Sequence, residues 1–111
     1  MEVSVEPRGA GVALVEVVGR LDLLSAAEVR SRLSTAVADG QRCLVVDLGR
    51  VEFIDSSGLG ALISGLKSAR QAGGDLRIAR PAEQARLVLQ LTTLDRVLRP
   101  HDSVEDALAS F

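Results

Sequence analysis

The sequence predicts an α/β fold, with a mixed, mostly parallel sheet of about four to five strands and about four helices packed on it. Apolar strand-like runs alternate with helical periodicity after an opening hairpin, which calls for right-handed crossovers and parallel strands. The run Cys43–Leu48 is apolar except for Asp47, as in a central strand covered on both faces. We expect the order β-β-α-β-α-β-α-β-α in a single domain, residues 1–111.

The N-terminal segment predicts the hairpin. Val3 and Val5 alternate with polar residues, which is typical of a half-buried edge strand. The turn-forming residues Pro7–Gly11 separate it from the more apolar run Val12–Val18. Because the connection is short, the two strands should be antiparallel.

A first helix is expected after Ser25, which forms a capping-box pattern with Glu28. The helix should end at Gly40, a favourable residue just beyond a helix C-terminus. Its predicted apolar face contains Ala26, Val29, Leu33, Ala36 and Val37.

A second helix is expected to follow the stretch of residues 53–60 and to stop at Gly73-Gly74. Apolar residues spaced three and four apart predict its core face: Leu59, Leu62, Ile63 and Leu66. The opposite stripe begins with two small residues and consists of Gly60, Ser64, Lys67 and Gln71.

The C-terminal part predicts shorter elements. Leu76–Ala79 reads as a strand, and Pro81 suits the first turn of the next helix. Val97–Leu98 is predicted as a last short strand, and Ser103 with Asp106 as the cap of a final helix. The apolar face predicted for the helix after Pro81 contains Ala85, Val88 and Leu91.

Composition narrows the function classes. Hydrophobic residues make up 47% of 111 residues, enough for a packed core. Aromatic residues make up 2%, the formal net charge is −2, and no basic run occurs, so we expect no nucleic-acid partner. The N-terminus lacks a signal-peptide pattern, and no apolar window reaches a membrane-spanning length, so we expect a cytoplasmic protein with no membrane partner. The single cysteine, Cys43, fits a reducing compartment.

Enzymatic interpretations fit poorly. The segment Gly58–Ile63 resembles a dinucleotide fingerprint, but Ile63 occupies its third glycine position. Neither Ser56 nor Ser57 has the flanking glycines of a nucleophile elbow. The one histidine, His101, is the only candidate base, and no metal-ligand cluster exists. We therefore expect no catalytic residue, no metal and no cofactor, and a protein that is not an enzyme.

The stretch Phe53-Ile54-Asp55-Ser56-Ser57-Gly58-Leu59-Gly60 places an acid, two hydroxyls and two glycines between a strand and a helix. One interpretation is helix capping, because Ser and Asp favour N-caps and Gly permits a tight bend. The other is a phosphorylation site, because there are more capping groups than one helix start needs and the site lies at the carboxyl ends of parallel strands. A phosphate there would act on a bound partner more than on the fold.

The same stretch resembles the signature of the STAS-domain anti-anti-sigma factors, which are anti-sigma factor antagonists of bacterial sporulation and stress response. Gly19-Arg20-Leu21-Asp22 looks like the family's Gly-x-Leu-Asp after its second strand. Gly73-Gly74-Asp75-Leu76 and Leu91–Val97 look like two further family segments, so the resemblance covers nearly the whole chain. It implies the STAS fold.

The resemblance also implies a cycle. The unphosphorylated protein would bind an anti-sigma factor that is also a serine kinase of the histidine-kinase-like ATPase fold, and so free the sigma factor in transcription regulation. The kinase would then phosphorylate Ser56, which ends binding, and a metal-dependent serine phosphatase would restore the protein. ATP and Mg²⁺ would belong to the partner.

The resemblance places Asp22 beside Ser56 in the partner-binding surface, although a solvated turn acid is the alternative. Asp55 would orient the Ser56 hydroxyl, cap the helix, or both, and Ser57 would support the helix start. The predicted partner-binding residues are Asp22, Asp55, Ser57, Gly58, Gly60 and Ser64. The alternative function is a non-switching STAS accessory or scaffold module, stressosome-like or part of a membrane transporter.

Overall fold

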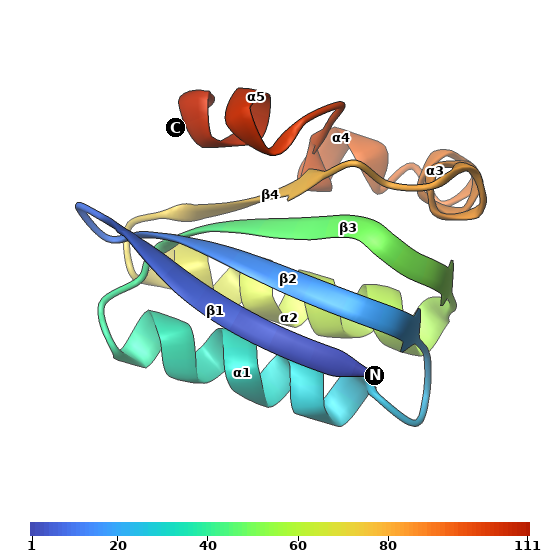
Figure 1. The fold of residues 1–111 in the computed structure, drawn as a ribbon, viewed down its shortest axis with the longest axis horizontal. Coiled ribbons are helices and arrows are strands. Elements are labelled where there is room, and N and C mark those ends of the chain that lie inside the picture. Colours follow the sequence, from blue (N-terminus) through green and yellow to red (C-terminus); the bar gives the residue numbers. More distant parts are fainter.

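A computed structural model describes residues 1–111 and places five strands in one sheet (Figure 1). The strands are β1 (Glu2–Gly9), β2 (Val12–Leu21), β3 (Cys43–Ile54), β4 (Asp75–Ala79) and β5 (Pro100–His101). They lie side by side in chain order; β1 pairs antiparallel with β2, and every later neighbour is parallel. The predicted fold class, including the opening hairpin, is confirmed.

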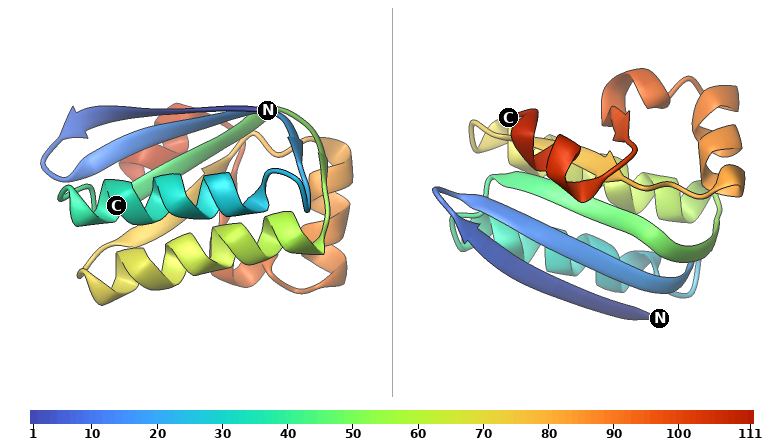
Figure 2. Two further views of the ribbon diagram at one scale, coloured as in Figure 1. Left: turned by 90° about the horizontal axis from the view of Figure 1, so that it is seen from below. Right: turned by 45° about the horizontal axis from the view of Figure 1, so that its top comes forward.

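Five helical segments cover the sheet unevenly. They are α1 (Ala26–Ala38), α2 (Ser56–Gln71), α3 (Glu83–Leu91), α4 (Asp95–Leu98) and α5 (Val104–Ala109). The helices α1 and α2 run side by side under one face, while α5 lies over β3 and β4 on the other (Figures 1 and 2). None of the five has the length and apolar composition that crossing a bilayer requires.

The main core lies between the sheet and the pair α1–α2. Side chains from alternate positions of β2 and β3 point into it, including Val15, Val17 and Leu44, which are fully buried. A smaller cluster of Val45, Ala79 and Ala107 lies under α5 on the opposite face. The strand β3 is thus buried on both faces over its first part, as its apolar run predicts.

The one charged residue of that apolar run, Asp47, forms an ion pair with Arg80. Asp47 is buried, and both its carboxylate oxygens accept from Arg80, from Nε at 3.0 Å and from Nη2 at 2.7 Å. The Gly49 N–H donates to the same carboxylate at 2.9 Å. This bidentate pair satisfies a charge that would otherwise be costly to bury, and it raises the pKa of Arg80.

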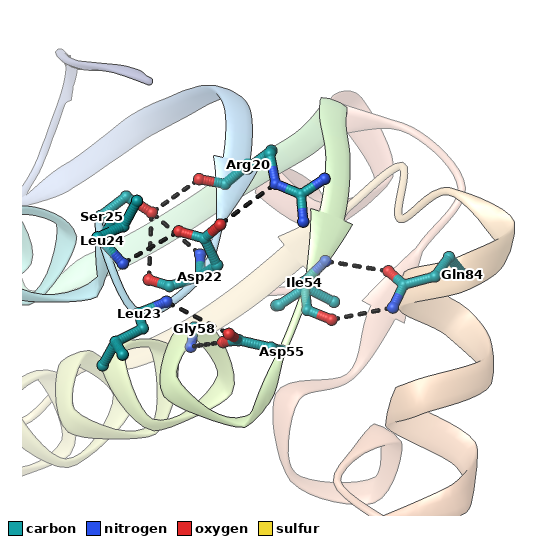
Figure 3. Close-up of polar contacts among 9 residues, drawn as sticks. All are labelled: Arg20, Asp22, Leu23, Leu24, Ser25, Ile54, Asp55, Gly58 and Gln84. Atoms are coloured by element: carbon teal, nitrogen blue, oxygen red, sulfur yellow. Dashed lines mark hydrogen bonds and ion pairs between the residues drawn. The ribbon is translucent and has the colours of Figure 1, made fainter.

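The central strand is longer than predicted, since β3 continues past Leu48 to Ile54. Its last part pairs with β2 only, because β4 ends opposite Asp47. On the open side, the Gln84 side chain of α3 replaces the missing strand. Its amide accepts from the Ile54 N–H at 3.0 Å and donates to the Ile54 carbonyl at 2.9 Å (Figure 3).

The predicted capping box at α1 is wrong. Ser25 occupies the N-cap position, but its hydroxyl makes no capping bond. It is buried, donates to the Arg20 carbonyl at 2.7 Å and accepts from the Asp22 N–H at 3.0 Å. The hydroxyl therefore braces the loop before the helix, because burial offers it backbone partners there.

Two predictions for the C-terminal part are also wrong. Val97–Leu98 belongs to the helical turn α4, and the last strand is Pro100–His101. A run of two apolar residues cannot distinguish strand from helix. The helix α3 begins at Glu83, two residues after Pro81, and buries Ala85 and Leu89 while Leu91 is exposed. By contrast, Ser103 caps α5 as predicted, accepting from the Asp106 N–H at 3.0 Å.

Asp75 makes the stability depend on pH. Partial burial alone would raise its pKa, but a hydrogen-bonded ion pair with Arg77, the Leu76 N–H at 2.9 Å and Arg70 at 3.2 Å together hold the pKa below its ordinary value of 3.8. A carboxylate whose pKa is lower in the folded state than in the unfolded state stabilises the protein at pH values above the unfolded-state pKa. That contribution is lost as pH falls through the folded-state value.

We therefore expect Asp75→Asn to lower the free energy of unfolding by about 0.5 kcal/mol at pH 7. The difference from the unmodified chain should stay constant down to about pH 5 and close as pH falls below about 4. Urea unfolding at several pH values measures it. The control Asp102→Asn removes an exposed ion-pair partner and should change little; a difference for Asp75→Asn that persists at pH 2 would contradict the assignment.

Candidate functional site

The candidate site lies where β2 and β3 end at the same edge of the sheet. The loop after β2 carries Asp22 and Leu23, and the loop after β3 leads into Ser56, the first residue of α2. The Asp55 N–H donates to the Leu21 carbonyl at 3.3 Å, which holds the two chain segments together. Residues more than thirty positions apart thus meet because their strands are parallel neighbours.

Asp55 is the N-cap of α2. Its backbone is extended, and its Oδ1 accepts at 2.9 Å from the N–H of Gly58, which is the third residue of the helix. Its Oδ2 accepts from the Leu23 N–H at 3.3 Å, in the other loop (Figure 3). The sequence predicts two roles for Asp55: capping the helix and orienting the Ser56 hydroxyl. Its hydrogen bonds cap the helix and link the two loops, and none of them reaches the Ser56 hydroxyl.

Gly58 permits close contact between those loops. It is buried, and a Cβ added there would overlap the carbonyl oxygen of Leu21. A side chain would therefore push the start of α2 away from the end of β2. Gly58 shapes the site and offers little surface of its own.

The two serines differ in exposure. Ser56 is exposed, whereas Ser57 is half-buried. Neither hydroxyl forms a hydrogen bond within the chain, and the side-chain bond at the start of the helix comes from Asp55. Ser56 presents an unpaired hydroxyl to solvent at the N-terminus of α2.

Beside Ser56 lies a shallow hollow of about 340 Å³ between the first turns of α1 and α2. Its lining residues are Leu23, Ala26, Ala27, Arg30, Ser56, Ser57 and Gly60. Ser64, one turn beyond Gly60, is half-buried and lies outside the hollow. Small side chains on both helices make this a surface that another molecule can approach closely.

Asp22 organises the loop before α1. Its Oδ1 accepts from the Leu24 N–H at 3.1 Å, and its Oδ2 pairs with Arg20 Nε at 3.2 Å. The same guanidinium lies 4.4 Å from the ring centre of Phe53. Asp22 is at the same edge as Ser56 but does not line the hollow, and instead lines a neighbouring one with Leu24.

Sequence reasoning missed two leucines at this edge. Leu23 is 74% exposed and Leu24 is 94% exposed, among the most exposed apolar side chains of the chain. Adjacent exposed leucines beside a hollow are typical of a protein-contact surface. The signal available in the sequence was two leucines in a loop, just before the helix and outside its apolar periodicity.

The sequence of the chain matches a known domain family. The model of the STAS domain family matches residues 5–107, nearly the whole chain. This chain belongs to the STAS domain family. The "Anti-sigma-F factor antagonist RsfB" of Mycobacterium tuberculosis is 34% identical over 98 residues, which cover 88% of this chain and 80% of that relative.

Solved structures agree with the assignment. The STAS domain described here superposes on a crystal structure of an anti-sigma factor antagonist from Mycobacterium paratuberculosis with a TM-score of 0.86 and 29% identity, covering 98% of this chain and 92% of the other. The unphosphorylated form of SpoIIAA gives a TM-score of 0.83 at 22% identity, over 96% and 93% of the two chains, and shows the same fold. Two Thermotoga relatives, 36% identical over 69 residues, are matched over 61% of their length. Anti-sigma factor antagonists are regulators rather than enzymes.

The capping role of Asp55 can be tested by stability. We expect Asp55→Ala to lower the free energy of unfolding by about 1–2 kcal/mol, because it removes the N-cap and the link to Leu23. Ser56→Ala and Ser57→Ala, which remove hydroxyls without hydrogen bonds, should change it by less than about 0.5 kcal/mol. Chemical denaturation of the three variants measures this, and equal losses for all three would contradict the assignment.

Proposed function

We propose that this STAS domain, acting as a single domain over residues 1–111, is an anti-sigma factor antagonist controlled by phosphorylation of Ser56. Its unphosphorylated form binds an anti-sigma factor that is also a serine kinase with the histidine-kinase-like ATPase fold, and the bound sigma factor is released. The kinase transfers the γ-phosphoryl group of ATP to the Ser56 oxygen, with loss of the hydroxyl proton and release of ADP. A metal-dependent serine phosphatase hydrolyses the phosphoester and resets the cycle.

One observation carries this proposal. Ser56 is the exposed serine of the motif, its hydroxyl has no partner in the chain, and the hollow and the exposed Leu23 adjoin it. A hydroxyl that only capped a helix would accept an N–H, and Asp55 already does so. The 34% identity to an anti-sigma-F factor antagonist supports the same partner class.

A phosphate at this position is compatible with the fold. The N–H groups of Ser56 and Ser57 begin the helix and have no partner within it, so they tolerate an anion. The Asp55 carboxylate repels the phosphate, but both its oxygens already accept N–H donors. These opposing local effects favour an intact domain after phosphorylation.

The effect of the phosphate falls on the bound partner. A desolvated, unpaired phosphate or a like-charge contact in an interface costs several kcal/mol, which is enough to abolish a micromolar complex. We propose that Leu23 and Leu24 supply the apolar part of that interface. Asp22 offers it a carboxylate, and Ser57, Gly60 and Ser64 offer the small surface of α2 beside the serine.

The switch predicts opposite behaviour for two variants of Ser56. Ser56→Ala should keep the affinity for the anti-sigma kinase and stay bound in the presence of ATP, because no phosphate can be added. Ser56→Asp should lower the affinity at least about tenfold, because the new carboxylate enters the interface unpaired. Calorimetry with anti-sigma factors encoded in the same genome measures both, with and without ATP.

Intact mass and site mapping after incubation with the kinase and ATP complete the test. One phosphate on Ser56 is expected. Phosphate on Ser57 would move the switch by one residue, and the absence of phosphate together with unchanged binding of both variants would favour an accessory or scaffold module instead.

The apolar part of the interface has its own test. Leu24→Asp should weaken kinase binding at least about tenfold while leaving thermal unfolding unchanged, because Leu24 is 94% exposed and contributes nothing to the core. The matched control is Leu91→Asp, which places the same charge on a 76% exposed leucine of α3. Equal binding by the two variants would place the interface elsewhere.

A further inference from the structure

Arg30 is the one cation that lines the hollow beside Ser56. It lies on α1, is exposed, and forms no ion pair and no hydrogen bond within the chain. Arg20, the other arginine at this edge, is already engaged by Asp22 and by the ring of Phe53. Arg30 therefore brings an uncompensated guanidinium to the side of a serine.

The Arg30 guanidinium lies close to Gly60 of α2. Apart from Gly60, its chain neighbours and the backbone of α2, the only atom within 4 Å of a Cβ built on Gly60 is Nη2 of Arg30, at 3.9 Å. Gly60 is four residues after Ser56, so the two positions are neighbours on one helix face, about 5–6 Å apart. Because Gly60 has no side chain, the path from the guanidinium to the Ser56 oxygen stays open.

The chemistry of the two groups is complementary. A phosphoserine carries about 1.5–2 negative charges and three acceptor oxygens. A guanidinium presents a planar fork of donors that binds phosphate oxygens in a bidentate manner. The carboxylate next to Ser56 in the chain, Asp55, accepts from the Gly58 and Leu23 N–H groups and forms no ion pair with Arg30.

We propose that Arg30 binds the phosphate on Ser56 within the same chain, so that phosphorylation closes the hollow between α1 and α2 with an ion pair. This inference rests on the proposed modification of Ser56. The pairing holds the phosphate against the α1 side of the hollow, over Ala26 and Ala27, the small surface that the unphosphorylated chain leaves open to a partner. The switch then adds a charge and also covers a contact surface.

The test installs phosphoserine directly at position 56 by genetic-code expansion, so that it needs no kinase. A ³¹P NMR titration then gives the second pKa of the phosphate, which is about 6 for an unperturbed group. A nearby positive charge favours the dianion and lowers this pKa. Arg30→Gln should therefore raise it by about 0.3–0.5 unit, an amount suited to an exposed pair.

The matched control is Lys67→Gln, which removes one positive charge from the exposed side of α2. Lys67 is three turns along the helix, about 16 Å from Ser56, beyond the reach of a screened charge at physiological salt. This variant should leave the phosphate pKa unchanged. Arg30→Lys, which keeps the charge but loses the fork, should give an intermediate value.

Equal phosphate pKa values in three phosphoserine chains would overturn the proposal: the chain without a further substitution, Arg30→Gln and Lys67→Gln. Arg30 is exposed and unpaired, so circular dichroism melting of Arg30→Gln should match the unmodified chain and excludes unfolding as a cause. Binding of the anti-sigma kinase to the phosphoserine chain is measured separately. If the phosphoserine chain no longer binds the kinase but Arg30→Gln leaves the phosphate pKa unchanged, only the role of Arg30 is rejected. If the phosphoserine chain still binds the kinase, the proposed switch is rejected, and the phosphate pKa alone then decides whether Arg30 pairs with the phosphate.

Discussion

The site depends on one carboxylate that bonds to two loops. Asp55 accepts the Gly58 N–H at the start of α2 and the Leu23 N–H in the loop after β2. A single side chain therefore sets the beginning of the helix and the position of its neighbouring loop. Because this carboxylate satisfies the helix N-terminus, the Ser56 hydroxyl remains free. The exposed leucines and the hollow are placed beside that hydroxyl by the same two bonds.

The rest of the sheet supports the position of Asp55. The strand β3 carries it past the end of β4, where Gln84 bonds both backbone groups of Ile54. Further back, the buried pair of Asp47 and Arg80 satisfies the one charge in the central strand. These contacts keep the edge at which β2 and β3 end in a fixed geometry. A rigid edge allows a small chemical change at its surface to be read by a partner.

The surface at this edge combines features that suit contact with another protein. Two exposed leucines, a shallow hollow lined mostly by small residues and an unpaired serine hydroxyl lie together. Under the proposal, a phosphate added there meets helix N–H groups and the Arg30 guanidinium on its own chain, so the fold tolerates it. In the proposed switch, the stability of the STAS domain lies in the sheet and core, and its regulation lies in a few exposed groups.

Sequence by itself determined the hairpin, the alternation of strands with α1 and α2, and the motif around Ser56, because these follow from local periodicity and turn chemistry. It missed the turn α4, the full length of β3 and the buried role of Ser25, since each depends on contacts with residues distant in the chain. Only the tertiary structure decided which of the crowded polar groups caps the helix. Parallel pairing of β2 with β3 brings the Leu23 N–H to Asp55, and that long-range contact leaves Ser56 as the group free to react.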